Sequence, residues 1–421
     1  MSNVLAKNVN LHVIPTKKYK TIHVLIRFAS ELTREKASLR TLLSSILETN
    51  SLNYPQQTDI SKKLSDMYGA KMGIGSSKKG NRHYLNAVFS MVNPKYLPNE
   101  AGLLAEGFNF MQEILLNPNA DGMQFDEETF HREKKNLISY VQSIYDDKQS
   151  LASLRLQSLY YSEDEAQQTP GFGRVEDVEK IENSELFNYY QQMLQEDEID
   201  IVILGDIDEQ DVLPLVQQFN FVDREALVAS PMYQRQRQLT VAERVEKLPV
   251  QQGKLNLAYQ TDAYFHDTHY FAMQVFNGIF GGFAHSKLFM NVREKESMAY
   301  YASSSLDTFR GMMTVQTGID SQNKEKVLAL VSEQLDAIRE GNISEEEMQQ
   351  TKAMIRNQFM LSQDNPSASI ESLYLAKKFP QSDISDDEWL NRLEAVTKEE
   401  VQAMAQKMEL QAIYFMEGGV A

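Results

Sequence analysis

The chain has 421 residues and 42% hydrophobic content, which predicts two packed domains of about 200 residues each. A net charge of −17 argues against nucleic acid or an anionic membrane as the main partner, since both attract a basic face, and favours a basic or neutral peptide. The sequence contains no cysteine, which excludes disulfides, thiol catalysis and cysteine zinc sites. No signal peptide is apparent and no apolar run reaches the ~18 residues of a membrane span, so we expect a cytoplasmic protein.

The first half alternates strands with amphipathic helices. Its periodicity predicts strands at residues 10–14, 21–28, 84–91 and 199–204, and helices at 38–47, 58–67, 100–116, 127–145 and 178–193. Thr58 is the expected cap of the second helix.

The second half repeats this order. The helix start Glu127-Glu128 matches Glu345-Glu346, half a chain further on, where Ser344 and Glu347 form a capping box. A single repeat of this length predicts a duplicated domain. We expect an α+β fold with two domains, 1–221 and 251–421, joined by a linker at 222–250. Each would be a mostly antiparallel sheet with helices packed on one face.

The most informative stretch is residues 280–305. It predicts a helix end, a glycine loop, a second helix begun by Ser286 and the start of a strand. Arg293 lies near the end of the second helix, and Tyr300 follows where the pattern becomes β-like. A guanidinium and a phenol brought together can both donate to one carbonyl oxygen. Without the surrounding pattern, Arg293 would be interpreted as a surface charge and Tyr300 as a ring that packs within the strand.

The runs FGG, SKLF, VREK and AY in this stretch resemble the second half of the pitrilysin/insulinase family of inverted-motif zinc peptidases, with Ser297 where the family usually has glycine. The resemblance covers nearly the whole chain and implies the fold of mitochondrial-processing-peptidase-like halves. It also implies that Arg293 and Tyr300 bind the substrate carbonyl opposite the zinc. Within the family, the chain most resembles a Gram-positive bacterial branch of paired inactive and active members.

The family's zinc site, H-x-x-E-H on the first long helix, is missing from this chain. Alignment on Tyr54-Pro55 places the motif on Thr41, Ser44 and Ser45, and a later ligand position falls on Tyr140. Hydroxyl groups are poor zinc ligands at neutral pH, and serine cannot replace the glutamate base. We therefore expect no cofactor in this chain and zinc in a partner subunit.

One other group could hold a metal. His266 and His269 are three residues apart, and Asp262 could add an oxygen ligand. These residues precede a predicted helix at 270–280, where Asp267 or Thr268 would cap, so the helix start is the favoured reading.

The predicted function is a non-catalytic, substrate-binding subunit of a heterodimeric zinc metallopeptidase that is not active alone. The partners would be a homologous H-x-x-E-H-bearing subunit and a peptide, with a homodimer possible for the isolated chain. One alternative is a non-enzymatic peptide-binding or scaffolding protein of the same fold. Solitary activity is a third reading, disfavoured because the ligands are missing. A neighbouring gene for a similar chain with an intact zinc motif would favour the peptidase subunit.

Overall fold

The computed structural model describes residues 2–100, 102–227 and 230–419. The chain forms two compact units that interleave in sequence. Unit 1 takes its residues from Met1–Ser143, Thr169–Ser230 and Pro366–Tyr374, and unit 2 from Ile144–Gln168, Pro231–Asn365 and Leu375–Ala421. Each half of the sequence therefore gives one segment to the unit formed mainly by the other half. The predicted domain boundaries at 221 and 251 do not include this exchange.

Within the described residues, unit 1 is built on six strands in the order β1-β2-β8-β3-β5-β4. The β2–β8 pair is parallel and the other pairs are antiparallel. The strands are β1 (Ser2–Ala6), β2 (Val9–Pro15), β3 (Thr21–Glu31), β4 (Lys71–Lys79), β5 (Arg82–Val92) and β8 (Glu198–Gly205), and β6 (Ala120–Asp121) pairs with β7 (Gln124–Phe125) as a small ribbon.

Helices cover one face of this sheet closely. Gly107 of α3 allows the approach, because a Cβ atom there would lie 2.7 Å from the sulfur of Met91 on β5. Phe110 of the same helix packs its ring against Phe89. The unit 1 helices are α1 (Arg34–Thr49), α2 (Gln57–Asp66), α3 (Leu103–Leu116), α4 (Glu127–Asp146), α7 (Val175–Val178), α8 (Asn183–Glu196) and α9 (Glu209–Gln217), with a 3₁₀ turn at Pro94–Tyr96.

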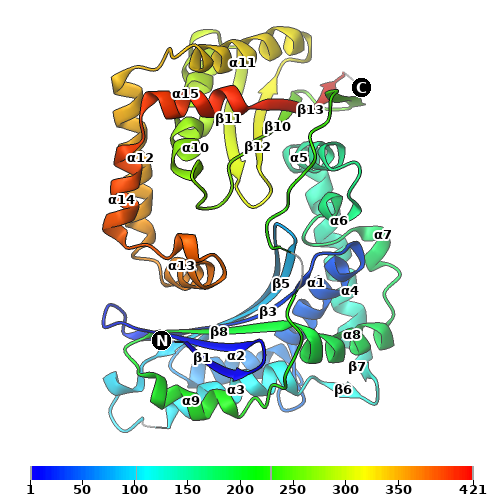
Figure 1. Cartoon of the computed structure of the whole chain (residues 1–421). Coiled ribbons are helices and arrows are strands. Elements are labelled where there is room, and N and C mark those ends of the chain that lie inside the picture. The colour runs from blue at the N-terminus through cyan, green and yellow to red at the C-terminus, as the bar shows by residue number, and fades with distance from the viewer. Residues whose placement is uncertain (1, 101, 228–229, 420–421) are drawn as a thin grey trace. The chain divides into compact units, whose positions relative to one another are not determined.

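The opposite face of the unit 1 sheet is covered by α13 (Pro366–Lys378), whose residues up to Tyr374 belong to this unit (Figure 1). Ile370 packs on Leu25, Val202 and Leu204. Side chains alternate between the two faces along a strand, so these residues of β3 and β8 lie on the face that α13 covers. Burying these apolar groups holds the helix on the sheet, although it lies far away in sequence.

An ion pair strengthens this attachment. The Arg27 side chain is only 9% exposed, and its guanidinium donates to Glu371 of α13 at 2.8 Å. Lys79 of β4 also pairs with Glu371. Burial alone would raise the pKa of the Glu371 carboxyl, but the two cations outweigh burial and hold that pKa below its usual value.

Unit 2 repeats the plan with strands in the order β11-β12-β10-β13-β9, of which β13–β9 is parallel. The strands are β9 (Ala242–Leu248), β10 (Gly253–Gln260), β11 (Ala299–Asp307), β12 (Met312–Ile319) and β13 (Glu409–Gly418). The helices are α5 (Lys148–Tyr160), α6 (Glu165–Gln168), α10 (Tyr270–Asn277), α11 (Lys324–Arg339), α12 (Glu345–Ser362), α14 (Asp386–Ala395) and α15 (Lys398–Lys407), with π-helices at Gly278–Gly282 and Leu288–Lys295 and 3₁₀ turns at Ser321–Asn323 and Pro380–Ser382.

The unit 2 sheet is also covered on both faces. Leu255 and Leu257 of β10 join the core made with helices α10, α11, α12 and α15. Ala258, the next residue after Leu257, faces the other way and packs in a cluster with Leu151 and Leu156 of α5. The predicted fold class, two duplicated α+β domains, is confirmed. The prediction placed helices on one face of each sheet, whereas each unit has one further helix on the opposite face.

Local details differ from the sequence expectations in several places, among them the start of α8 at Asn183, five residues after the predicted start at 178. Helix α2 begins one residue earlier than predicted, with Gln56 rather than Thr58 as its cap. Strand β9 lies inside the predicted linker, because its side chains are mostly exposed and give little periodic signal. The predicted capping box of Ser344 and Glu347 at the start of α12 is present.

We predict that Glu371→Gln destabilises the protein by about 2 kcal/mol at neutral pH, because it leaves the buried Arg27 guanidinium without its charged partner. The folded-state pKa of Glu371 is depressed, so its stabilising contribution is present above the unfolded-state pKa of about 4.3 and lost as pH falls through the folded-state value. Urea unfolding midpoints at pH 7 and at acidic pH measure this. The matched change Glu333→Gln, at an exposed position of α11, should have little effect at either pH; equal effects of the two changes would contradict the prediction.

Candidate functional site

The predicted helix that carries Arg293 is a π-helix, Leu288–Lys295, whose backbone bonds span five residues, as in the bond from the Glu296 N–H to the Asn291 carbonyl. The Ser286 side chain accepts from the N–H of Phe289 at 3.4 Å, close to the predicted cap position. Leu288 and Val292 are fully buried and fix the helix to the unit 2 core. Such wide turns occur often at functional sites.

Arg293 projects from this anchored helix. Its guanidinium lies over the ring of Phe289, 4.4 Å from the ring centre, and its Nε is 3.5 Å from Glu294. The side chain is 40% exposed. Stacking on Phe289 restricts the guanidinium, while exposure leaves its donors accessible to a ligand.

Tyr300 lies on β11, an edge strand of the unit 2 sheet. The pairing with β12 shifts at this residue: Ala299 is opposite Ile319, and Tyr301 is opposite Gly318. Tyr300 is therefore the unpaired residue of a β-bulge, and its side chain is 63% exposed. Bulges at sheet edges re-aim a side chain, and here the bulge directs the phenol to the surface.

Among the described residues, the structure records no contact between the Arg293 and Tyr300 side chains. Both come from the same short segment of unit 2, and both are accessible. Their predicted joint action on one carbonyl oxygen therefore remains a prediction.

Glycine residues allow the backbone near this segment to pack closely. A Cβ atom on Gly281 would lie 2.7 Å from the backbone nitrogen of Ser304 and 2.8 Å from Leu288. A side chain at 281 would thus push apart the π-helix that carries Arg293 and strand β11, which carries Tyr300.

The positions aligned with the zinc motif lie on α1 in unit 1, and local hydrogen bonds occupy their hydroxyl groups. Thr41 Oγ1 lies 2.7 Å from the Ser76 hydroxyl on β4 and 2.9 Å from the Ala37 carbonyl oxygen. The hydroxyls of Ser44 and Ser45 both donate to the carbonyl of Thr41. These groups satisfy the helix and its contact with the sheet.

The loop at residues 169–173 packs over this part of α1. The Gly171 carbonyl accepts from Thr41 at 3.3 Å and from His83 Nε2 at 2.7 Å. Gly173 has φ +82°, and a Cβ atom there would lie 2.8 Å from the Cα of Ser38. Tyr140 of α4 is 55% exposed, and the edge of its ring contacts Phe172 of the same loop. The positions aligned with the zinc site thus pack against the loop at residues 169–173.

These side chains do not fit a zinc ion. The described residues contain no group of three histidine, cysteine, aspartate or glutamate side chains placed to hold a metal. His83 lies nearby, but its Nε2 donates to Gly171 and is not free to ligate. Burial lowers the pKa of His83 to about 3, and the nearby Arg40 adds to this shift. The imidazole is therefore neutral and structural.

The second candidate metal group, beside α10, makes other contacts. The His266 ring stacks on Tyr270 at 4.5 Å. His269 Nε2 lies 2.7 Å from the ammonium of Lys407. Asp262 pairs with Arg237. Asp267 accepts the N–H of His269, in the capping role favoured from the sequence, although the residue that flanks the helix is His269 itself.

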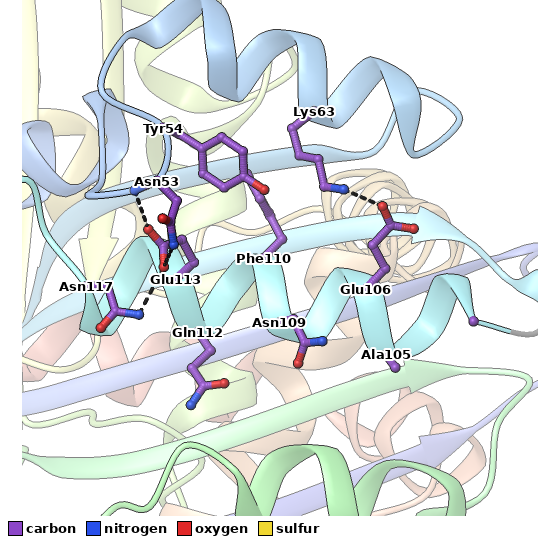
Figure 2. Close-up of a pocket in the computed structure, with 11 residues that line it drawn as sticks. Asn53, Tyr54, Lys63, Ala105, Glu106, Asn109, Phe110, Gln112, Glu113 and Asn117 are labelled. Atoms are coloured by element: carbon purple, nitrogen blue, oxygen red, sulfur yellow. Dashed lines mark hydrogen bonds and ion pairs between the residues drawn. The ribbon is translucent and has the colours of Figure 1, made fainter.

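A cavity of about 520 Å³ lies between α2 and α3 of unit 1 (Figure 2). Its main carboxylate, Glu113, accepts hydrogen bonds from Ser51, Asn53 and Asn117, and Lys63 pairs with Glu106 at its other end. Burial would raise the pKa of Glu113, but these donors outweigh burial and lower it. The polar groups satisfy one another, so we assign this cavity a structural role.

Comparison with known proteins agrees with this geometry. Residues 180–355 match the family described as the peptidase M16 inactive domain. The probable inactive metalloprotease YmfF of Bacillus subtilis is 33% identical over 97% of this chain and 95% of its own length. A conserved protein from Enterococcus faecalis V583 is 52% identical, with a TM-score of 0.97 over 100% of this chain and 99% of that chain. The M16 inactive domain from Pseudomonas fluorescens, 17% identical over 100% of this chain and 98% of its own, shares the fold with a TM-score of 0.78.

In the described part of the chain, the positions aligned with the family's metal site carry hydroxyl groups and a packed loop. The chain belongs to the M16 peptidase family, as the sequence resemblance predicted, and its residues 180–355 match that family's inactive domain. No helix in the described part of the chain is both long and apolar enough to cross a bilayer.

We predict that Gly281→Ala destabilises the protein by about 1–3 kcal/mol, because the added methyl meets the backbone of Ser304, which cannot move aside cheaply. Gly75→Ala is the matched control, since nothing lies within 4 Å of a Cβ atom on Gly75. Urea unfolding midpoints compare the two variants with the unaltered chain. Equal stability of the two would show that the close approach at Gly281 is not required.

Proposed function

We propose that this chain is the non-catalytic, substrate-binding subunit of a heterodimeric zinc metallopeptidase, and that it supplies Arg293 and Tyr300 to the partner's site for peptide hydrolysis. One contrast carries the proposal. Arg293 and Tyr300 are accessible on ordered elements of unit 2, whereas the hydroxyls at the zinc-motif positions of unit 1 are used internally. This combination fits a chain that binds a peptide while another chain performs the chemistry.

The two side chains suit one chemical task. The Arg293 guanidinium offers several N–H donors, and the Tyr300 phenol offers one O–H donor. Together they would donate to the oxygen of the scissile peptide bond as negative charge develops on it. A donor of this kind acts most strongly when its position is fixed in advance, and the stacking of Arg293 on Phe289 supports that role.

The partner would be a homologous subunit with an intact H-x-x-E-H motif, which brings the zinc, and the pair would work in the cytoplasm. The isolated chain could pair with itself, since the same interface would be presented by a chain of the same fold. The second candidate is a non-enzymatic peptide-binding or scaffolding protein. It would leave Arg293 without a role in any reaction, so the consequence of changing Arg293 separates the two.

The test is to mix the chain with its H-x-x-E-H-bearing homologue and follow cleavage of a fluorogenic peptide library. Arg293→Ala should lower kcat by ~10²–10³, the usual cost of losing one donor to a developing oxyanion. The heterodimer should still form, as measured by size-exclusion chromatography with light scattering.

Lys295→Ala is the matched control, because Lys295 is an exposed cation on the same π-helix. It should leave kcat nearly unchanged. Full activity of the Arg293→Ala heterodimer would refute the proposed role, and peptide binding without any cleavage by the unaltered pair would favour the scaffolding alternative.

A further inference from the structure

A groove of about 490 Å³ lies on the unit 1 sheet beside α13. Strands β3, β4 and β5 form its floor, and Ile370 and Glu371 of α13 form one wall. All of these residues belong to unit 1, so the groove is complete within one compact body. It lies on the sheet face opposite the one covered by α3.

The floor of the groove is apolar where a central strand is left uncovered. Val88 of β5 is 50% exposed, although β5 is paired on both sides, with β3 and β4. Leu25 on the neighbouring strand and Ile370 on α13 line the same space. Exposed apolar side chains in a concave site are typical of surfaces that bind another apolar group.

Arg27 supplies a guanidinium that can donate a further hydrogen bond. Its guanidinium lies between the rings of Tyr84 and Tyr374, at 4.8 and 4.2 Å from their centres. Nε donates to Asn86 and Nη2 to Glu371, but the buried Nη1 has no hydrogen-bond partner among the described residues. A buried donor without a partner costs free energy, which an acceptor on a ligand would recover.

The charge of the groove is opposite to that of the whole chain. Two cations and one carboxylate line the groove, although the whole chain carries −17. At the groove, Arg27 and the exposed Lys71 outnumber the single carboxylate of Glu371, which is already paired with both Arg27 and Lys79. Carboxylates on a ligand would therefore meet unneutralised positive charge at this place.

We propose that this groove binds a peptide segment with apolar side chains flanked by aspartate or glutamate, so that apolar groups cover Val88 and a carboxylate meets Lys71 and the spare nitrogen of Arg27. The inference rests on the proposed function and specifies the substrate class. It reverses the expectation of a basic or neutral peptide drawn from the net charge, because short-range contacts depend on the local charge of the groove.

The test uses four capped synthetic peptides and isothermal titration calorimetry on the full chain alone, at low ionic strength. The probes are acetyl-GEELFLEEG-amide, its counterparts with lysine or glutamine in place of every glutamate, and GEESSSEEG, which lacks the apolar centre. The glutamate peptide should bind at least about tenfold more tightly than the lysine peptide, and the glutamine peptide should have an intermediate affinity. The serine-centred acidic peptide should bind less tightly than the glutamate peptide with the apolar centre.

Lys71→Glu should weaken binding of the acidic apolar peptide by about 3- to 10-fold, as expected for reversing a partly exposed charge contact. Val88→Ser should also weaken it. Lys62→Glu is the matched control, because Lys62 is an exposed lysine on α2 outside the groove, and it should change the affinity less than about twofold.

Tighter or equal binding of the lysine peptide, equal effects of Lys71→Glu and Lys62→Glu, or no binding of any peptide would each overturn the inference. These outcomes are separate from the peptidase test, since binding is measured without the partner. A failed peptidase role would appear as unaltered cleavage by the Arg293→Ala heterodimer while charge-selective binding in the groove persisted.

Discussion

The structure depends on covering a second apolar face of each sheet. In unit 1, Leu25, Val202 and Leu204 form that face, and Ile370 of α13 buries them. In unit 2, Ala258 takes the equivalent place under Leu156 of α5. Each covering helix is contributed by the other half of the sequence. Each half of the sequence therefore relies on one helix from the other half to cover the second face of its sheet.

This exchange also shapes the surfaces available for binding. Helix α13 covers only part of the unit 1 sheet, and Val88 remains exposed beside it. The ion pair between Arg27 and Glu371 fixes the helix at that position and leaves one guanidinium nitrogen unpaired. The same contact that completes the fold therefore also defines the wall of the groove, and stability and binding are linked through Arg27.

At the positions aligned with the zinc motif, the structure differs from a metal site in more than its ligands. Thr41, Ser44 and Ser45 make backbone and side-chain hydrogen bonds of their own, and Gly171 and Gly173 bring a loop against the helix that carries them. Restoring histidines on α1 would therefore not recreate a metal centre without also moving this loop. The segment with Arg293 and Tyr300 has no such obstruction, since both side chains are exposed.

Much of this could be predicted from the sequence because it depends on local patterns. Hydrophobic periodicity predicted β2, β3, β5 and β8 and helices α1 to α4 and α8, and the match of Glu127 with Glu345 indicated the duplication. The exchange of α5 and α13 could not be predicted, because an amphipathic helix does not indicate which sheet it will cover. The exposed strand β9 gave no periodic signal, and the groove depends on Arg27, Lys71 and Val88, which meet only when three strands pair.

The central claim is that this chain contributes peptide-binding groups while its partner holds the metal. Metal analysis of the purified heterodimer, alongside each chain purified separately, tests it most directly. The account predicts one zinc per heterodimer, retained by the partner when it is isolated and absent from this chain. Stoichiometric zinc bound to this chain alone, or two zinc ions per heterodimer, would contradict it.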